Sequence, residues 1–182
     1  YSSAASDVYK RQVLYLAIIA QFIIQLIALS INGINPIVYM KKSLALLILA
    51  FTSRSSVGCL PVTIETLTQK LGVNQATASF VAGFGTTAGM QGCAGIFPSL
   101  LIVYVCHLTG TTMDFSMIVM TIIVVTLGSL GIAGIPGTAT MAASVGLSGV
   151  GMASSFSLIG PILAIDPLID MARTMLNVSG SV

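Results

Sequence analysis

The chain has 182 residues, of which 55% are hydrophobic and only 7% are charged, and its net charge is +2. A soluble domain carries roughly 25% charged residues, so the composition excludes an ordinary soluble protein and predicts an all-α membrane protein with the lipid bilayer as its partner. The small, scattered charge gives no basis for binding nucleic acid. No metal-ligand cluster or nucleophile–base pair is visible, so we expect no enzyme.

The first residues differ in character from the rest of the chain. Residues 1–12 (YSSAASDVYKRQ) are polar and stop abruptly before a long apolar run. We interpret them as a foreign or mis-joined leader, the alternative being an ordinary polar terminus. Residues 13–31 are almost wholly apolar and long enough for a spanning helix, which needs roughly 20 residues.

Three Gly- and Ser-rich interruptions divide the next part of the chain. Residues 37–71 form two short arms around FTSRSSVGCLP, and residues 115–147 form two arms around GSLGIAGIPG, so each predicts a re-entrant helical hairpin. Residues 76–107 are too long for one unbroken span, and GFGTTAGMQG in their middle predicts a discontinuous helix. Irregular backbone at membrane depth is tolerated only where it is buried in protein or lines a cavity.

The last helix is predicted over residues 154–178, with kinks at Pro161 and Pro167. At 100° per residue its polar side chains share one side and apolar side chains occupy the other. A polar stripe in a membrane helix is expected to face the protein interior and to be functional. The stripe consists of Asp166, Asp170, Arg173, Thr174, Asn177 and Ser181.

This order of elements indicates a transporter. Paired short segments interrupted by Gly and Pro are typical of secondary transporters that bind substrate near the bilayer midplane. Two alternatives remain open: hairpins of this kind also build the selectivity filters of channels, and the chain could be an inactive membrane fragment. The Asp–Arg pair could also serve only to pack helices together.

Four motifs in this order carry a family resemblance: FTSRSSVGCLPVT, GTTAGMQGCAG, GSLGIAGIPGTATM and IDPLIDMARTMLNVSG. Over residues 13–182 the chain resembles the dicarboxylate/amino acid:cation symporter family, which has the glutamate-transporter fold. GMQGCAG and GIPGTATMAAS most resemble its L-cystine uptake branch. The resemblance implies a partial transport domain and a symporter that takes up an amino acid, with L-cystine favoured. It also implies a homotrimer in the bacterial inner membrane.

The resemblance assigns substrate-binding roles. The tip of the first hairpin, with Arg54, Ser55 and Ser56, holds the substrate carboxylate, as backbone N–H groups at a helix N-terminus can do. Asp170 meets the substrate amino group and Arg173 its distal acidic group, in a two-pronged contact that arginine favours. Thr174 and Asn177 complete the contacts, Cys93 lies near the substrate side chain, and Ile135 through Ala139 form the gate.

Departures from the family pattern concern the coupling ion. Acidic-amino-acid members carry Asn-Met-Asp-Gly-Thr where this chain has GMQGC, so Gln91 replaces one cation-binding carboxylate, and Ser181 replaces another. Cys93 replaces a threonine, which leaves an acidic amino acid or dicarboxylate as the alternative substrate. No cofactor is expected beyond a coupling Na⁺ or H⁺.

Two coupling schemes fit these departures. In one, a single sodium ion is held by a mainly backbone carbonyl site at Thr87, Met90, Ser129, Leu130 and Ile132. In the other, a proton is carried by Asp166, Asp170 or Glu65. The residues alone do not choose between them.

Overall fold

The computed structural model describes the backbone of residues 2–182 and the side chains from Gln12 onward. The predicted leader, residues 1–12, falls almost entirely outside the described side chains and stays a prediction. The described residues are helical and contain no strand, which confirms the all-α prediction. The elements are α1 (Ser2–Ile31), α2 (Pro36–Ser53), α3 (Leu60–Glu65), η1 (Thr66–Lys70), α4 (Gln75–Ala88), η2 (Gln91–Ile96), α5 (Phe97–Thr109), α6 (Phe115–Ser129), α7 (Thr138–Gly149), η3 (Ala153–Ile159), α8 (Gly160–Ala164) and α9 (Asp166–Gly180).

The first hairpin, predicted over 37–71, consists of α2 and the shorter arm formed by α3 and η1. The Asn35 side chain begins α2 by accepting hydrogen bonds from the backbone N–H groups of Ile37 and Val38, at 2.9 and 3.3 Å. Such caps satisfy N–H groups that have no partner within the helix. The helix ends at Arg54, whose φ of 54° turns the chain into the tip.

The discontinuous helix, predicted over 76–107, consists of α4, η2 and α5. Gly89 and Met90 separate α4 from η2, and η2 is a π-helical turn that leads directly into α5. Local π-helical turns are frequent at functional sites. The second hairpin, predicted over 115–147, consists of α6 and α7 joined by a tip at residues 130–137.

The structure differs from the single last helix predicted over 154–178. A 3₁₀ segment and α8 precede α9, and the two parts meet at an angle of 86°. Pro167 lies in the first turn of α9 and has no backbone N–H group. Its ring also clashes with the preceding turn, so the helix breaks one residue before Asp166.

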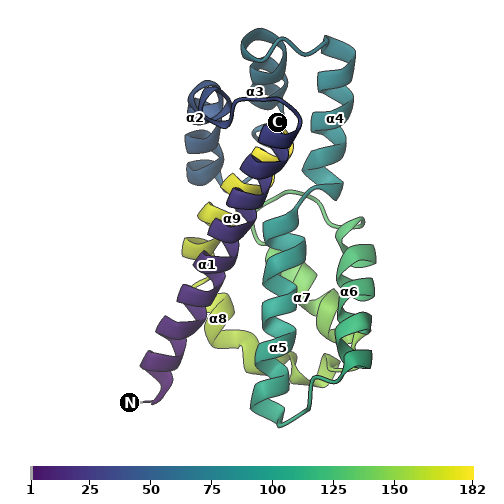
Figure 1. Cartoon of the computed structure of the whole chain (residues 1–182). Helices are drawn as coiled ribbons and strands as arrows, with labels where there is room; N and C mark the ends of the chain where they lie inside the picture. The colour runs from purple at the N-terminus through teal and green to yellow at the C-terminus, as the bar shows by residue number, and fades with distance from the viewer. Residues whose placement is uncertain (1) are drawn as a thin grey trace.

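The two halves of the molecule meet at α9. Figure 1 shows α2, α3 and α4 at one end and α5, α6 and α7 at the other, with α9 running beside α1. Helix α9 packs against α1, α2, α4 and η2, while α5 and α6 both pack against α7. The largest hydrophobic core joins α5 and α7 to α1 and α9, through Phe97, Leu101, Ala143, Leu147 and Leu176.

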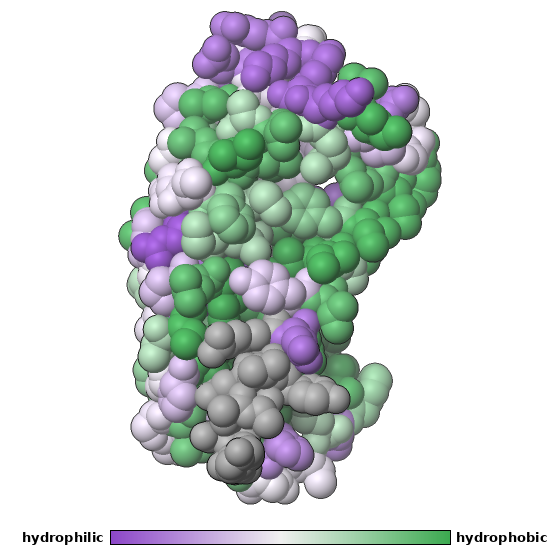
Figure 2. Space-filling model, turned by 90° about the vertical axis from the view of Figure 1, so that its left-hand side faces the viewer, coloured by the Kyte–Doolittle hydropathy of each residue, from purple (hydrophilic) through white to green (hydrophobic). Residues whose placement is uncertain are grey.

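The outer surface is strongly apolar. The face in Figure 2 carries mostly hydrophobic residues over its middle and a hydrophilic cap at its top. Among the described residues, three helical stretches are long and apolar enough to cross a membrane, namely Gln12–Ile31, Pro36–Ser53 and Gln75–Thr109. Whether the two hairpins re-enter the bilayer stays a prediction.

Candidate substrate-binding site

The polar stripe of α9 lies inside the protein. Arg173 is 0% exposed, and Asp166 and Asp170 are each 5% exposed. Thr174 and Asn177 are buried on the same helix. Buried charges are expensive unless they are paired, so their pairing determines what the site can do.

One guanidinium nitrogen of Arg173 contacts both carboxylates. Its Nη2 lies 2.5 Å from Oδ1 of Asp166 and 3.2 Å from Oδ1 of Asp170. The Nε and Nη1 atoms are buried and have no hydrogen-bond partner among the described residues. The ring of Phe97 covers the guanidinium, with 3.9 Å between Cζ and the ring centroid. Two donor atoms of a fully buried arginine are therefore not used by the described part of the protein.

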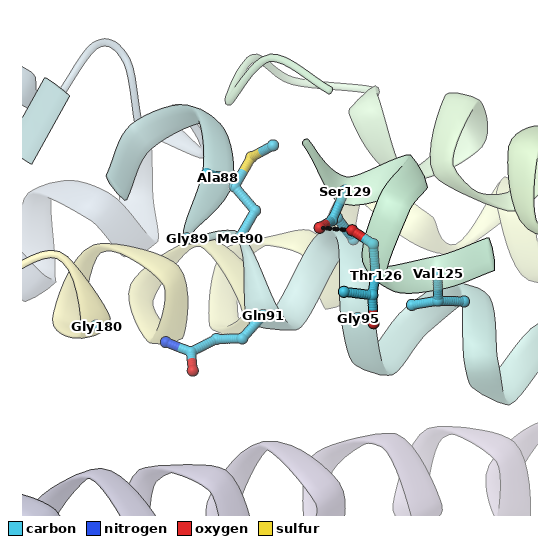
Figure 3. A pocket seen from close by; sticks show the side chains of 10 residues that line it. Ala88, Gly89, Met90, Gln91, Gly95, Val125, Thr126, Ser129 and Gly180 are labelled. Atoms are coloured by element: carbon cyan, nitrogen blue, oxygen red, sulfur yellow. Dashed lines mark hydrogen bonds between the residues drawn. The ribbon is translucent and has the colours of Figure 1, made fainter. Parts of the chain in front are cut away.

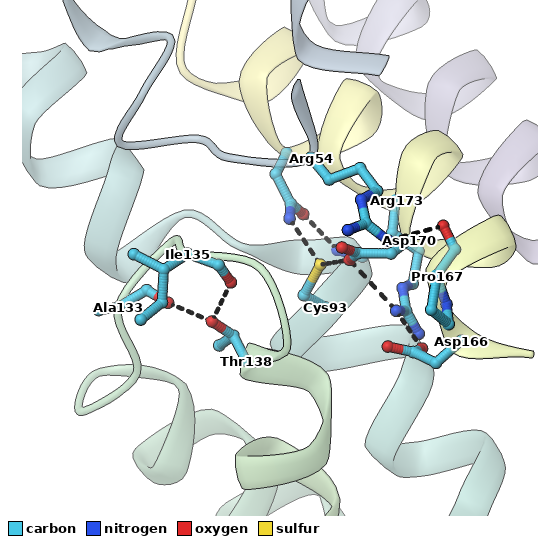
Figure 4. Close-up of polar contacts among 11 residues, drawn as sticks. Arg54, Cys93, Ala133, Ile135, Thr138, Asp166, Pro167, Asp170 and Arg173 are labelled. Atoms are coloured by element: carbon cyan, nitrogen blue, oxygen red, sulfur yellow. Dashed lines mark hydrogen bonds and ion pairs between the residues drawn. The ribbon is translucent and has the colours of Figure 1, made fainter. Parts of the chain in front are cut away.

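The break in the discontinuous helix is held directly against α9. The backbone N–H of Gly92 donates to Oδ1 of Asn177 at 2.7 Å, and Nδ2 of Asn177 donates to Sγ of Cys93 at 3.1 Å. The Cys93 thiol in turn lies 3.5 Å from Oδ1 of Asp170 (Figure 4). A Cβ atom on Gly92 would come within 2.9 Å of the carbonyl oxygen of Arg173, so this approach requires glycine.

The tips of the two hairpins touch each other beside this group. The backbone N–H of Val57 and the hydroxyl of Ser55 both donate to the carbonyl oxygen of Gly134, at 3.1 and 3.3 Å. Ser56 is buried beneath the same contact. Nη1 of Arg54 donates to the carbonyl oxygen of Pro167 at 3.2 Å, which joins the first tip to the start of α9.

The predicted gate residues take different environments. Ile135 is 51% exposed at the tip, whereas Ala139 is buried in α7 as part of the main core. The hydroxyl of Thr138 donates to the carbonyl oxygens of Ala133 and Ile135 and so ties the tip to the start of α7 (Figure 4).

The five predicted cation-site residues gather only in part. Met90 and Ser129 line one cavity of about 360 Å³, together with Gln91 and Gly180 (Figure 3). Met90 and Ile132 share a small buried cluster. The side chains of Thr87 and Leu130 are exposed. Among the described residues, no group of three or more His, Cys, Asp or Glu side chains is arranged so that it could hold a metal ion.

The two positions that depart from the family's carboxylates make neutral contacts. Oε1 of Gln91 accepts a hydrogen bond from Nε2 of Gln21 on α1 at 2.9 Å. The Ser181 hydroxyl donates to the carbonyl oxygen of Asn177 at 3.1 Å. Glu65, one of the predicted proton carriers, is exposed at the end of α3.

Comparison with known proteins identifies the family. Residues 9–182 match the sodium:dicarboxylate symporter family. The chain belongs to this family. The sodium:dicarboxylate symporters are transporters and not enzymes. The apolar helices, the family and its bacterial relatives together indicate a multi-pass protein of the bacterial cell membrane.

Curated relatives of this family member are named L-cystine uptake protein TcyP. The protein from Bacillus cereus is 43% identical over 168 residues, and those from Bacillus licheniformis and Shouchella clausii are 44% identical over the same length. Each alignment covers 92% of this chain and 36% of the relative. The chain therefore spans about a third of the length of the relatives it matches.

Three contacts of this candidate site were not predicted from the sequence. Phe97 lies in an apolar run, where nothing distinguishes it from its neighbours except that it follows Cys93 by four positions and so shares its helix face. Gly134 is one of several glycines in its tip, and only the fold shows which glycine the other hairpin contacts. Gln21 is separated from Gln91 by 70 residues, and no local pattern joins them.

Proposed function

We propose that the natural protein containing this chain is a secondary active symporter that takes up L-cystine. The single observation that carries the proposal is the fully buried Arg173, which faces two carboxylates and keeps two donor atoms unpaired. The name shared by the relatives supports cystine as the substrate. Cystine has an amino and a carboxylate group at each end, so one end can meet Asp170 and the other Arg173.

Each polar group has a role in this mechanism. Asp170 accepts the substrate ammonium, Asn177 and Thr174 orient the adjacent carboxylate, and Arg173 binds the carboxylate at the far end. Substrate carboxylate competes for Arg173 with Asp166, so binding exchanges one ion pair for another. The tip of the second hairpin then closes against the first, and the domain carries the substrate across the bilayer.

The coupling ion is either one sodium ion or a proton. The neutral contacts of Gln91 and Ser181 argue against additional sodium ions, because hard cations favour carboxylate oxygens. A single sodium ion would rely on backbone carbonyls near Met90 and Ser129. A proton would be carried at Asp166, whose carboxylate contacts Arg173 and would lose that partner when the substrate carboxylate binds.

An acidic amino acid or dicarboxylate is the second candidate substrate. The family's description favours it, because Arg173 can take the distal carboxylate of either substrate class. Channel activity and an inactive fragment remain the alternatives in other functional classes. We further propose a homotrimer for the natural protein, which the mass of the detergent-purified protein tests.

Uptake into proteoliposomes decides among these functions. Labelled L-cystine, L-glutamate and L-serine are supplied to the natural protein while the sodium gradient and the pH gradient are varied separately. Saturable cystine uptake and exchange of labelled for unlabelled cystine are expected, whereas a channel gives no exchange. Arg173→Ala should abolish cystine uptake at a normal protein level, and unchanged uptake would contradict the role given to Arg173.

A further inference from the structure

We propose that Phe97 is a positioning residue of the substrate site, whose ring holds the guanidinium of Arg173 in the plane from which it binds the distal carboxylate of the substrate. The inference deepens the proposed function and rests on it. It adds a residue without charge or hydrogen-bonding groups to a site that otherwise consists of polar contacts.

The contact between the two side chains is close and fully enclosed. The ring centroid of Phe97 lies 3.9 Å from Cζ of Arg173, and both residues are 0% exposed. An arginine over an aromatic face within about 6 Å is attracted by the ring quadrupole, and the attraction is strongest where water is excluded. This pair meets both conditions.

The ring compensates for an incomplete hydrogen-bond arrangement. Within the part of the chain that the structure describes, only Nη2 of Arg173 is hydrogen-bonded, to Asp166 and Asp170, while Nε and Nη1 are buried without partners. An arginine held at one nitrogen could rotate about that contact. The ring fixes the guanidinium plane from one face, so the unpaired N–H groups keep their directions before a carboxylate arrives.

The position of Phe97 in the fold keeps the ring itself in place. Phe97 is the first residue of α5, immediately after the π-helical turn η2, and Pro98 follows it in the first turn. Its ring also belongs to the main core with Leu101 and Ala172. A group fixed by packing before binding avoids part of the entropy that ordering it would cost.

The chemistry of the ring bears on the substrate class. Asp166, Asp170 and Arg173 together carry one net negative charge, and Phe97 supports Arg173 without adding a third carboxylate. The Nε and Nη1 donors of Arg173 are therefore left for a carboxylate on the substrate. Four residues earlier, the Cys93 thiol lies on the same helix face. The discontinuous helix thus places an uncharged thiol and an aromatic ring against the charged stripe of α9.

Fluorinated phenylalanines test this role because fluorine weakens the ring quadrupole and scarcely changes the ring's size. We would place one-, two- and three-fold fluorinated phenylalanine at position 97 of the natural protein and measure the KM and maximal rate of L-cystine uptake. The KM is expected to rise stepwise to about tenfold, with a smaller effect on the maximal rate. Phe97→Leu should raise the KM at least as much.

Phe84 provides the matched control, because it is 61% exposed on α4 and stacks on Phe80 instead of on a cation. The same fluorinated residues at position 84 should leave the KM unchanged. A flat KM series at position 97 overturns the inference, even if Phe97→Leu is defective. If the wild-type protein takes up no cystine, the proposed function fails separately. In that case the melting temperatures of the fluorinated variants test the contact between Phe97 and Arg173. A melting temperature that falls stepwise with fluorination at position 97 but not at position 84 supports the contact, and equal melting temperatures in the two series overturn it.

Discussion

The contact between the hairpin tips predicts a large effect of Gly134→Ala. A Cβ atom at this position would lie 2.7 Å from the carbonyl oxygen of Thr86 and 2.9 Å from Cβ of Ser56. Neither neighbour is the end of a flexible side chain, so the second tip must move away from the first. The movement breaks the two hydrogen bonds that the Gly134 carbonyl oxygen accepts from Ser55 and Val57.

The size of the effect follows from these two bonds. An intramolecular hydrogen bond contributes about 1 kcal/mol net, so the closed arrangement of the tips loses about 2 kcal/mol. Every 1.4 kcal/mol is a factor of ten in an equilibrium constant, so the population of closed tips relative to open tips falls by a factor of about 30. Substrate uptake that requires closure should fall by up to this factor.

Distance measurements and uptake test this prediction together. Spin labels at Val57 and Ile135, both exposed at the tips, should report a longer and broader distance in Gly134→Ala. Gly131→Ala is the control on the same tip, because its Cβ has no neighbour nearer than 3.9 Å. If Gly134→Ala keeps the distance and the uptake rate of Gly131→Ala, the tips are not coupled as we infer.

Three further substitutions test the helix contacts by chemical or thermal unfolding. Asp166→Asn should lower the free energy of unfolding by about 3 kcal/mol, because it breaks a buried ion pair of Arg173. Its control is Asp114→Asn at an exposed helix start, which should change the free energy of unfolding by less than about 0.5 kcal/mol. Equal losses in the two variants would refute the role of the ion pair. Gln21→Leu should lower the free energy of unfolding by about 1–2 kcal/mol, because it leaves Gln91 without its hydrogen-bond partner. Gln12→Leu, on the exposed part of the same helix, should not lower it. Tyr39→Phe should lower the free energy of unfolding by about 1 kcal/mol, because the Tyr39 hydroxyl donates to the carbonyl oxygen of Ser179 at 2.6 Å. Tyr15 is partly exposed, so Tyr15→Phe should leave the free energy of unfolding unchanged.

The arrangement of local elements could be predicted from the sequence because local signals encode it. Hydrophobic length predicts the helix over 13–31, and the Gly-rich interruptions predict both hairpins and the discontinuous helix. The stripe of α9 follows from helical spacing alone. The last helix could be predicted only in part. Pro161 and Pro167 predict kinks in one helix, whereas the structure has two segments that meet at 86°. A proline identifies the position of a break, but packing on both sides sets its angle.

The sequence by itself determined the membrane character, the family and the polar residues of the candidate site. These properties depend on composition, spacing and motif order, which need no knowledge of distant neighbours. Only the tertiary structure decided which partners those residues have. It places Phe97 on Arg173, Gly134 between the hairpin tips and Gln21 beside Gln91. Each contact joins segments far apart in the chain. The sequence of an apolar run or a glycine-rich tip does not indicate which of its residues faces the site, because that depends on how the distant segments pack.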